Sequence, residues 1–91
     1  MELKGTAKAQ SDLIRVHDFL ASVNKTAAIR AVQTLSAAPL QLLQHPRIGE
    51  RLEEFEPRDV RRIVVGAYEI RYEIAGSTVF ILRIWHGRED R

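Results

Sequence analysis

The side chains best suited to chemistry lie in the second half of the chain. From Arg47 onward nine arginines meet nine acidic residues, and lysine is absent. The planar guanidinium group pairs bidentately with carboxylates, either within a fold or across an interface. His86 adds an imidazole, the side chain that exchanges protons near neutral pH. Two interpretations of His86 stay open: it is a general acid or base, or it anchors the end of the last strand through hydrogen bonds.

Metal and cofactor chemistry has weaker support. The chain has three histidines and no cysteine, which leaves no thiolate ligand and no disulfide framework. His17 and His45 have no carboxylate or further histidine at ligand spacing, so we expect neither a metal site nor a cofactor. The acidic run of Glu53, Glu54 and Glu56 is more typical of a solvated turn than of a catalytic carboxylate pair.

Composition and charge place the chain among small globular domains. Its 91 residues, 45% hydrophobic and 29% charged, predict a single domain over residues 1–91. The apolar run at residues 79–82 is far too short to cross a membrane, and no secretion signal begins the chain, so we expect a cytoplasmic protein. The net charge is only +2, whereas proteins that hold nucleic acid through its phosphates carry a larger cationic surplus. We therefore expect no direct sequence-specific binding to nucleic acid.

Helical patterns dominate the first half of the chain. Residues 1–4 predict a short strand, after which Thr6 suits the N-cap of a helix over residues 7–21. Asn24 suits the cap of a second helix with the same apolar spacing. The two helices are expected to run antiparallel.

A short helix and then three strands are predicted for the rest of the chain. Pro39 cannot donate the helical hydrogen bond, so a separate short helix is expected over residues 40–44. The residues after it alternate with the period of a strand and are rich in β-branched and aromatic types. Tight turns separate three predicted strands, at residues 60–65, 68–74 and 78–85. This order, β-α-α-(α)-β-β-β, predicts an α+β domain with a helical hairpin on one face of a small antiparallel sheet.

Alternation along the strands assigns side chains to the two faces of the sheet. We expect the helix-covered face to hold seven apolar residues of the last two strands, Tyr68, Ile70, Tyr72, Ile74, Phe80, Leu82 and Ile84. Matching the two strands requires an odd-length loop at residues 75–77, with a glycine or its neighbour at positive φ. Glu69 then lies opposite Arg83, in a solvent-facing charged ladder with Arg71 and Glu73.

The same alternation leaves Val79, Ile81, Arg83 and Trp85 on the face without helices. The three apolar members form more hydrophobic surface than a small monomer usually exposes to water. Either the C-terminal residues fold over them or a partner chain covers them, and we prefer the partner chain.

An ordered set of residues spans nearly the whole chain. It comprises Ala9, Asp12-Leu13, Phe19-Leu20, Asn24, Pro46, Gly49, Val60-Arg61, Tyr68-x-Ile70-x-Tyr72-x-Ile74 and Ile81-Leu82-Arg83-Ile84-Trp85-His86-Gly87-Arg88-Glu89-Asp90. In these positions the chain resembles the RelE/ParE superfamily of type II toxins, and more closely its ParE branch. One departure is Gly5, where similar proteins carry a large aromatic residue after the first strand.

The resemblance implies a bacterial toxin that a small antitoxin holds inactive. The expected antitoxin is a ribbon-helix-helix protein similar to ParD, whose helical and then extended C-terminal segment wraps over the toxin. The residues expected to bind it are those of the face without helices, Val79, Ile81, Arg83 and Trp85.

The resemblance also raises the question of the target. RelE-like members cleave messenger RNA on the ribosome, which needs a base, an acid and cations for the transition-state charge. Here that alternative would use His86, Arg61, Arg62, Arg83 and Arg88. Members similar to ParE poison DNA gyrase instead. Two features favour gyrase: Glu69 stands where the ribonucleases place a phosphate-binding arginine, and no tyrosine follows Trp85.

We therefore expect a toxin that acts by binding DNA gyrase, without catalytic residues of its own. A ribosome-dependent ribonuclease and an inactive member that only binds antitoxin are the alternatives. The cationic surplus lies on the predicted helical hairpin, where it could steer encounter with an acidic partner. The gyrase-binding candidates there are Lys8, Arg15, Lys25 and Arg30.

Overall fold

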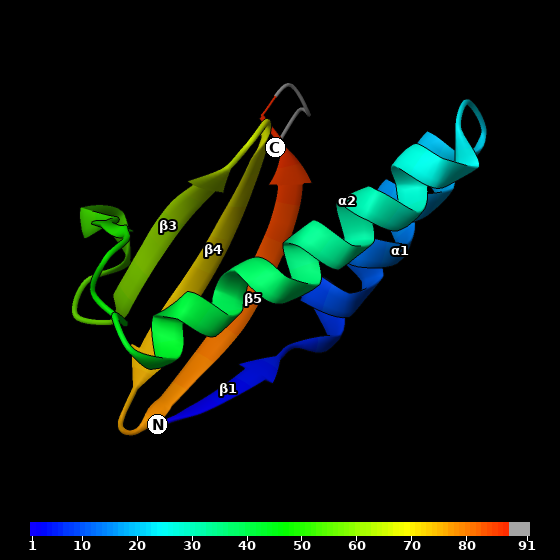
Figure 1. The fold of residues 1–91 in the computed structure, drawn as a ribbon. Coiled ribbons are helices and arrows are strands. Elements are labelled where there is room, and N and C mark those ends of the chain that lie inside the picture. Colours follow the sequence, from blue (N-terminus) through cyan, green and yellow to red (C-terminus); the bar gives the residue numbers. More distant parts are fainter. Residues whose placement is uncertain (88–91) are drawn as a thin grey trace.

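The computed structural model describes residues 1–87, and it contains the predicted elements in the predicted order, with a two-residue strand and a second 3₁₀ helix that were not predicted (Figure 1). The elements are β1 (Glu2–Gly5), α1 (Ala7–Ala21), α2 (Lys25–Ala37), the 3₁₀ helix η1 (Ala38–Leu43), β2 (Glu50–Arg51), the 3₁₀ helix η2 (Glu53–Phe55), β3 (Asp59–Val65), β4 (Tyr68–Ala75) and β5 (Thr78–His86). Arg88 of the candidate ribonuclease set lies outside the described residues. None of the helices over residues 1–87 has the length and apolar character needed to cross a membrane.

The five strands form one mixed sheet in the order β1-β5-β4-β3-β2. The antiparallel meander of β3, β4 and β5 was predicted, but β1 pairs with β5 in parallel. The expectation of a wholly antiparallel sheet was therefore wrong for β1. The helices α1 and α2 run antiparallel and extend beyond the sheet at their connection (Figure 1).

The helix boundaries follow from local capping. Thr6 Oγ1 accepts a hydrogen bond from the Ala9 amide, and Asn24 Oδ1 accepts one from the Ala27 amide. Each side chain satisfies an amide that the first turn of a helix leaves without a partner. At the other end of α2, Pro39 lies in the first turn of η1 and ends the regular α-helix. Both caps and the break at Pro39 were predicted from the residues alone, but the short helix was expected over residues 40–44 and instead spans Ala38–Leu43.

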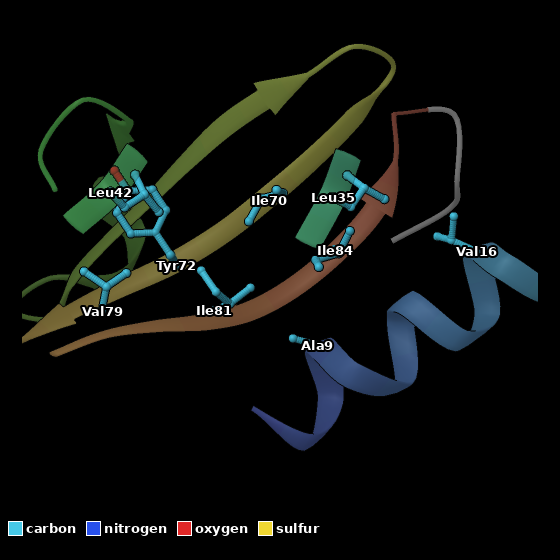
Figure 2. Close-up of a cluster of buried hydrophobic side chains, with 9 residues drawn as sticks. All are labelled: Ala9, Val16, Leu35, Leu42, Ile70, Tyr72, Val79, Ile81 and Ile84. Atoms are coloured by element: carbon cyan, nitrogen blue, oxygen red, sulfur yellow. The ribbon is translucent and has the colours of Figure 1, made fainter. Parts of the chain in front are cut away.

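The core lies between the helices and one face of the sheet, which we call the helix-covered face (Figure 2). Leu35 of α2 and Leu42 of η1 are fully buried against Ile70, Tyr72 and Ile84 of the sheet. The expectation that Tyr68, Ile70, Tyr72 and Ile74 share this face is confirmed, because all four belong to the core cluster or pack against it.

A β-bulge in β5 overturns the assignment of faces in that strand. Arg71 pairs with Arg83 but Tyr72 pairs with Ile81, so Leu82 has no partner across the ladder. An extra residue reverses the alternation of side chains on one side of the bulge. Val79 and Ile81 therefore point into the core, with exposed fractions of 0% and 4%, and do not project from the face without helices.

Further corrections follow from the same bulge. Phe80 pairs with Glu73, on the opposite face from Ile74 and Val79, so it does not belong to the helix-covered face. Glu69 pairs with Trp85 and not with Arg83. The predicted odd-length loop is also wrong, because Ala75 pairs with Thr78 around a two-residue turn. Gly76 in that turn has the predicted positive φ, at +60°.

Candidate functional site on the open face of the sheet

The open face is the side of the sheet opposite the helices. Neighbouring strands place its central residues side by side: Arg62 of β3 pairs with Arg71 of β4, and Glu69 and Arg71 pair with Trp85 and Arg83 of β5. Arginine and carboxylate side chains thus lie side by side on this face, with Trp85 next to Glu69 near the end of β5.

Arginine and aromatic side chains stack along the open face. The guanidinium carbon of Arg71 lies 5.1 Å from the centre of the Phe55 ring and 4.8 Å from that of Trp85. The guanidinium of Arg83 lies 5.4 Å from the Trp85 ring on its own strand. These distances are typical of cation–π contacts. They bury the indole of Trp85 within its own chain, with 5% of the residue exposed.

Glu69 lies buried among the arginines. Its carboxylate accepts a hydrogen bond from Arg62 at 3.3 Å and lies 3.7 Å from Arg71. Only 5% of the residue is exposed, so the prediction of a solvent-facing position was wrong for Glu69. A buried carboxylate needs such partners because burial without them is costly. The same two arginines are therefore occupied by a negative charge of the chain itself.

The remaining arginines of this surface are paired in the same way. Arg58 makes two hydrogen bonds to Glu73, at 3.1 and 2.8 Å, and they lower the pKa of that carboxyl. Arg83 makes two to Asp12 of α1, at 2.8 and 3.2 Å. A groove of about 470 Å³ runs between the start of α1 and the open face, with Lys8, Arg58, Arg71 and Arg83 among its lining residues.

Asp12 is the most buried charged residue of α1, with 3% of the residue exposed, and it joins this helix to β5. Besides Arg83 and Arg15, its carboxylate accepts the backbone amide of Ile84 at 2.8 Å. Burial alone would raise the pKa of Asp12, but these hydrogen bonds outweigh burial and hold the pKa below its usual range. Arg15 in turn donates to the Ile84 carbonyl at 3.0 Å.

The candidate ribonuclease residues divide between the two faces. His86 contacts Tyr68 edge-on, with ring centres 5.3 Å apart, and Tyr68 packs against the core. Arg61 donates to the carbonyls of Arg47 and Gly49, both at 3.1 Å, and holds the loop before β2. Arg62 and Arg83 lie on the open face. Within residues 1–87 the set therefore does not converge on one point.

Similarity to known proteins extends over almost the whole chain. The family model described as "ParE toxin of type II toxin-antitoxin system, parDE" matches residues 3–91. The chain belongs to the ParE toxin family.

Relatives of this ParE-family toxin carry both names of the superfamily. It is 33% identical to the Caulobacter vibrioides protein named Toxin RelE1 over 86 residues, which cover 94% of this chain and 92% of that one. It is 35% identical to Toxin RelE2 of the same organism over 81 residues, 89% of each chain. A solved structure described as the chromosomal ParDE TA system from P. aeruginosa matches with a TM-score of 0.78 and 27% identity, over 94% of this chain and 95% of that one.

Membership of the ParE family makes the chain a toxin of a type II toxin-antitoxin system, with a cognate antitoxin as its partner. Val79 and Ile81 do not project from an uncovered face, as their assignment to antitoxin binding required, because the helices of this chain already cover both side chains. Arg83, whose side chain is 41% exposed, remains accessible. The antitoxin contacts of Arg83 and Trp85 stay predictions.

Two features of this ParE-family toxin were not found from its sequence. One is the pair of hydrogen bonds that the side chains of Asp12 and Arg15 make with the backbone of Ile84, far away in the sequence. The other is Tyr72, whose hydroxyl donates to the Pro46 carbonyl at 2.8 Å and accepts the Gly49 amide at 2.9 Å. The alternation placed Tyr72 in the core correctly, but it gave no sign that the hydroxyl holds a loop.

Proposed function

We propose that this ParE-family toxin is a cytoplasmic protein that inhibits growth by binding DNA gyrase, and that a ribbon-helix-helix antitoxin neutralises it. The observation that carries the proposal is the pairing of four arginines of the open face with carboxylates of the chain. The pairs are Arg58 with Glu73, Arg62 with Glu69 and Glu50, Arg71 with Glu69, and Arg83 with Asp12.

The pairing bears on the choice between gyrase and messenger RNA. Cleavage of RNA through a ribose hydroxyl places extra negative charge on the phosphate in the transition state, and preorganised cations must meet it. Glu69 places a buried negative charge between Arg62 and Arg71. A phosphate there would be repelled by Glu69 and would have to compete with it for both arginines. This favours a function that needs no phosphate chemistry.

The helical hairpin has the features of a surface that binds protein. Phe19 and Val23, near its tip, are 74% and 85% exposed, and Ile29 is 53% exposed. Lys25 and Arg30 are exposed on α2 beside them. Exposed aromatic and aliphatic side chains with arginine nearby are common in protein interfaces. Of the four candidates, Arg15 differs because it already binds Asp12 and Ile84.

The test uses the purified toxin and a charge-reversal variant, Lys25→Glu with Arg30→Glu. We expect the unmodified toxin to stabilise gyrase–DNA cleavage complexes and to leave ribosome-bound messenger RNA uncut. The variant should lose gyrase poisoning and keep its affinity for antitoxin. The matched control is Arg47→Glu, at an exposed arginine in the loop before β2, compared with the single change Arg30→Glu so that the two variants carry the same net charge.

Three results would contradict parts of the proposal. Ribosome-dependent cleavage of messenger RNA by the unmodified toxin would replace gyrase with the ribosome as target. Equal gyrase poisoning by the hairpin variants and the control would remove the hairpin from the gyrase interface. Absence of both activities in a folded toxin would favour the inactive antitoxin-binding alternative.

A further inference from the structure

A narrow apolar slot, which we call the Gly5 slot, opens between β1 and the two helices. Its volume is about 230 Å³. Buried core residues form its floor, and the exposed residues Gly5, Gln10 and Ser36 lie at its mouth. The floor includes Ala9, Leu35, Ile81 and Ile84, all of which are labelled in Figure 2.

The slot exists because one side chain is missing from the row that faces the core. Leu3 and Gly5 of β1 pair with Val79 and Ile81 of β5, and both of these β5 residues point into the core. Leu3 packs against that core, whereas Gly5 has no side chain to continue the row. A Cβ added at Gly5 would meet only Gln10 Nε2 within 4 Å, at 3.9 Å.

The backbone does not require glycine at position 5. The glycines with positive φ are Gly66 and Gly76, so Gly5 has a conformation that other residues adopt. The position also has free space in front of it. The absence of a side chain at Gly5 is therefore neither a steric nor a conformational necessity of this fold.

The size and lining of the slot suit one large apolar side chain. An apolar cavity of about 150 Å³ in a protein core is enough to hold a benzene molecule. The slot is somewhat larger and is open on one side, so the ring of a phenylalanine, tyrosine or tryptophan fits it. Such a ring would contact residues that are already held in place by the core, which keeps the entropic cost of binding low.

We propose that the Gly5 slot receives a single large apolar side chain, most simply an aromatic one, from the cognate antitoxin. The proposal rests on the antitoxin partner of the toxin family and not on the choice of gyrase as target. The position of the slot fits an extended antitoxin segment, because β1 is an edge strand of the sheet. An edge strand can hydrogen-bond to an added segment, whose side chains alternate in direction, and an aromatic neighbour across from an edge glycine stabilises a sheet.

The test replaces the missing side chain. In Gly5→Leu the toxin's own side chain occupies the slot, so we expect an unchanged or higher melting temperature and an affinity for antitoxin that falls by about 10- to 100-fold, the value of one buried large side chain. Gly5→Ala is the matched control, because its Cβ has room and leaves most of the slot empty. Its affinity should stay within about threefold of the unmodified toxin.

A second measurement uses the unmodified chain and so does not depend on how Gly5→Leu folds. Indole, added to the free toxin, should shift the methyl resonances of Leu35 and Ile84, and bound antitoxin should abolish these shifts. Shifts that persist in the complex, or a Gly5→Leu toxin that folds and binds antitoxin with unchanged affinity, would overturn the proposal. So would a free toxin that dimerises through the slot, since a second copy would then be the occupant.

Failure of this proposal and failure of the proposed target give different results. If Gly5→Leu binds antitoxin normally and the toxin still poisons gyrase, only the slot assignment is wrong. If Gly5→Leu escapes antitoxin but the toxin leaves gyrase unaffected, only the target is wrong. If the toxin poisons gyrase and Gly5→Leu escapes antitoxin, both proposals hold. The Gly5→Leu toxin should then inhibit growth even in cells that express the antitoxin.

Discussion

The carboxylate of Asp12 accepts the backbone amide of Ile84 at 2.8 Å, so a helix side chain takes the place of a strand beside β5. The partner strand β1 pairs with β5 only as far as Ile81. Beyond that point Asp12 accepts the amide of Ile84 and Arg15 donates to its carbonyl. Covering a sheet edge in this way satisfies its backbone groups and blocks the addition of another chain.

Asp12→Asn should therefore destabilise the fold more than the loss of one surface charge. The amide can still accept the Ile84 N–H, but it loses the charge-assisted hydrogen bonds to Arg15 and Arg83. Hydrogen bonds to charged groups are worth about 1.5–3 kcal/mol each in mutational series, and the arginines can regain water, so we expect a loss of about 2 kcal/mol in urea unfolding. The control is Asp18→Asn, whose exposed carboxylate should change the stability by less than about 0.5 kcal/mol.

The depressed pKa of Asp12 predicts the direction of a pH effect. The folded-state pKa lies below that of an unfolded aspartate, about 3.9, so the unfolded chain binds more protons in this region. The stabilisation is present above the unfolded pKa and is lost as the pH falls through the folded value. The free energy of unfolding should fall more steeply below pH 4 in the unmodified toxin than in Asp12→Asn. Parallel pH profiles would show that Asp12 does not contribute.

Tyr72→Phe should loosen the loop before β2 while the core keeps its shape. The change removes the acceptor for the Gly49 amide and the donor for the Pro46 carbonyl. A buried amide without a partner costs about 1–3 kcal/mol. Hydrogen exchange at Gly49 should quicken by more than the global change in stability explains. The Ile84 amide, which donates to Asp12 Oδ2 at 2.8 Å in a buried contact, is the internal control and should follow global stability.

The local parts of the fold were predictable because short-range chemistry determines them. The caps at Thr6 and Asn24 act on amides three residues away, and Pro39 lacks the hydrogen that a regular helix needs. The strands were found from alternation for the same reason. Each of these signals depends on residues that are neighbours in the sequence.

The face on which each side chain of β5 lies was not predictable, because no particular residue type marks the position of this bulge. The sequence of residues 79–85 is compatible with a strand with or without the bulge. Packing with distant residues such as Leu35 and Tyr72 decides which of its side chains enter the core. The contacts of Asp12 with Ile84 and of Tyr72 with Gly49 likewise join distant parts of the chain. The prediction of the antitoxin-binding site was wrong for the same reason, since two of its four candidate residues were placed on the wrong face.

Gly49→Ala should be far more damaging than the same change at Gly5. A Cβ at Gly49 would lie 2.6 Å from both the Arg62 carbonyl oxygen and the Tyr72 hydroxyl. Neither atom is the end of a flexible side chain, because one is backbone of β3 and the other is held by the loop. We expect a loss of about 1–3 kcal/mol, as is typical of overpacked sites, whereas Gly5→Ala should be close to neutral. Similar melting temperatures for the two variants would contradict the tight approach of the loop to Tyr72.

Trp85→Ala separates two roles for the indole. From the sequence Trp85 was expected to be an anchor for the antitoxin, but in the structure Arg71 and Arg83 of the same chain cover its ring, at 4.8 and 5.4 Å. If the ring acts within the chain, removing it should cost about 3 kcal/mol of unfolding free energy and should change antitoxin affinity little at temperatures where the variant is folded. An antitoxin anchor would give the reverse, a small loss of stability and a weakening of the complex by more than about 2 kcal/mol. Trp85→Phe keeps a ring beside both guanidinium groups, so it should recover most of the lost stability under the first explanation.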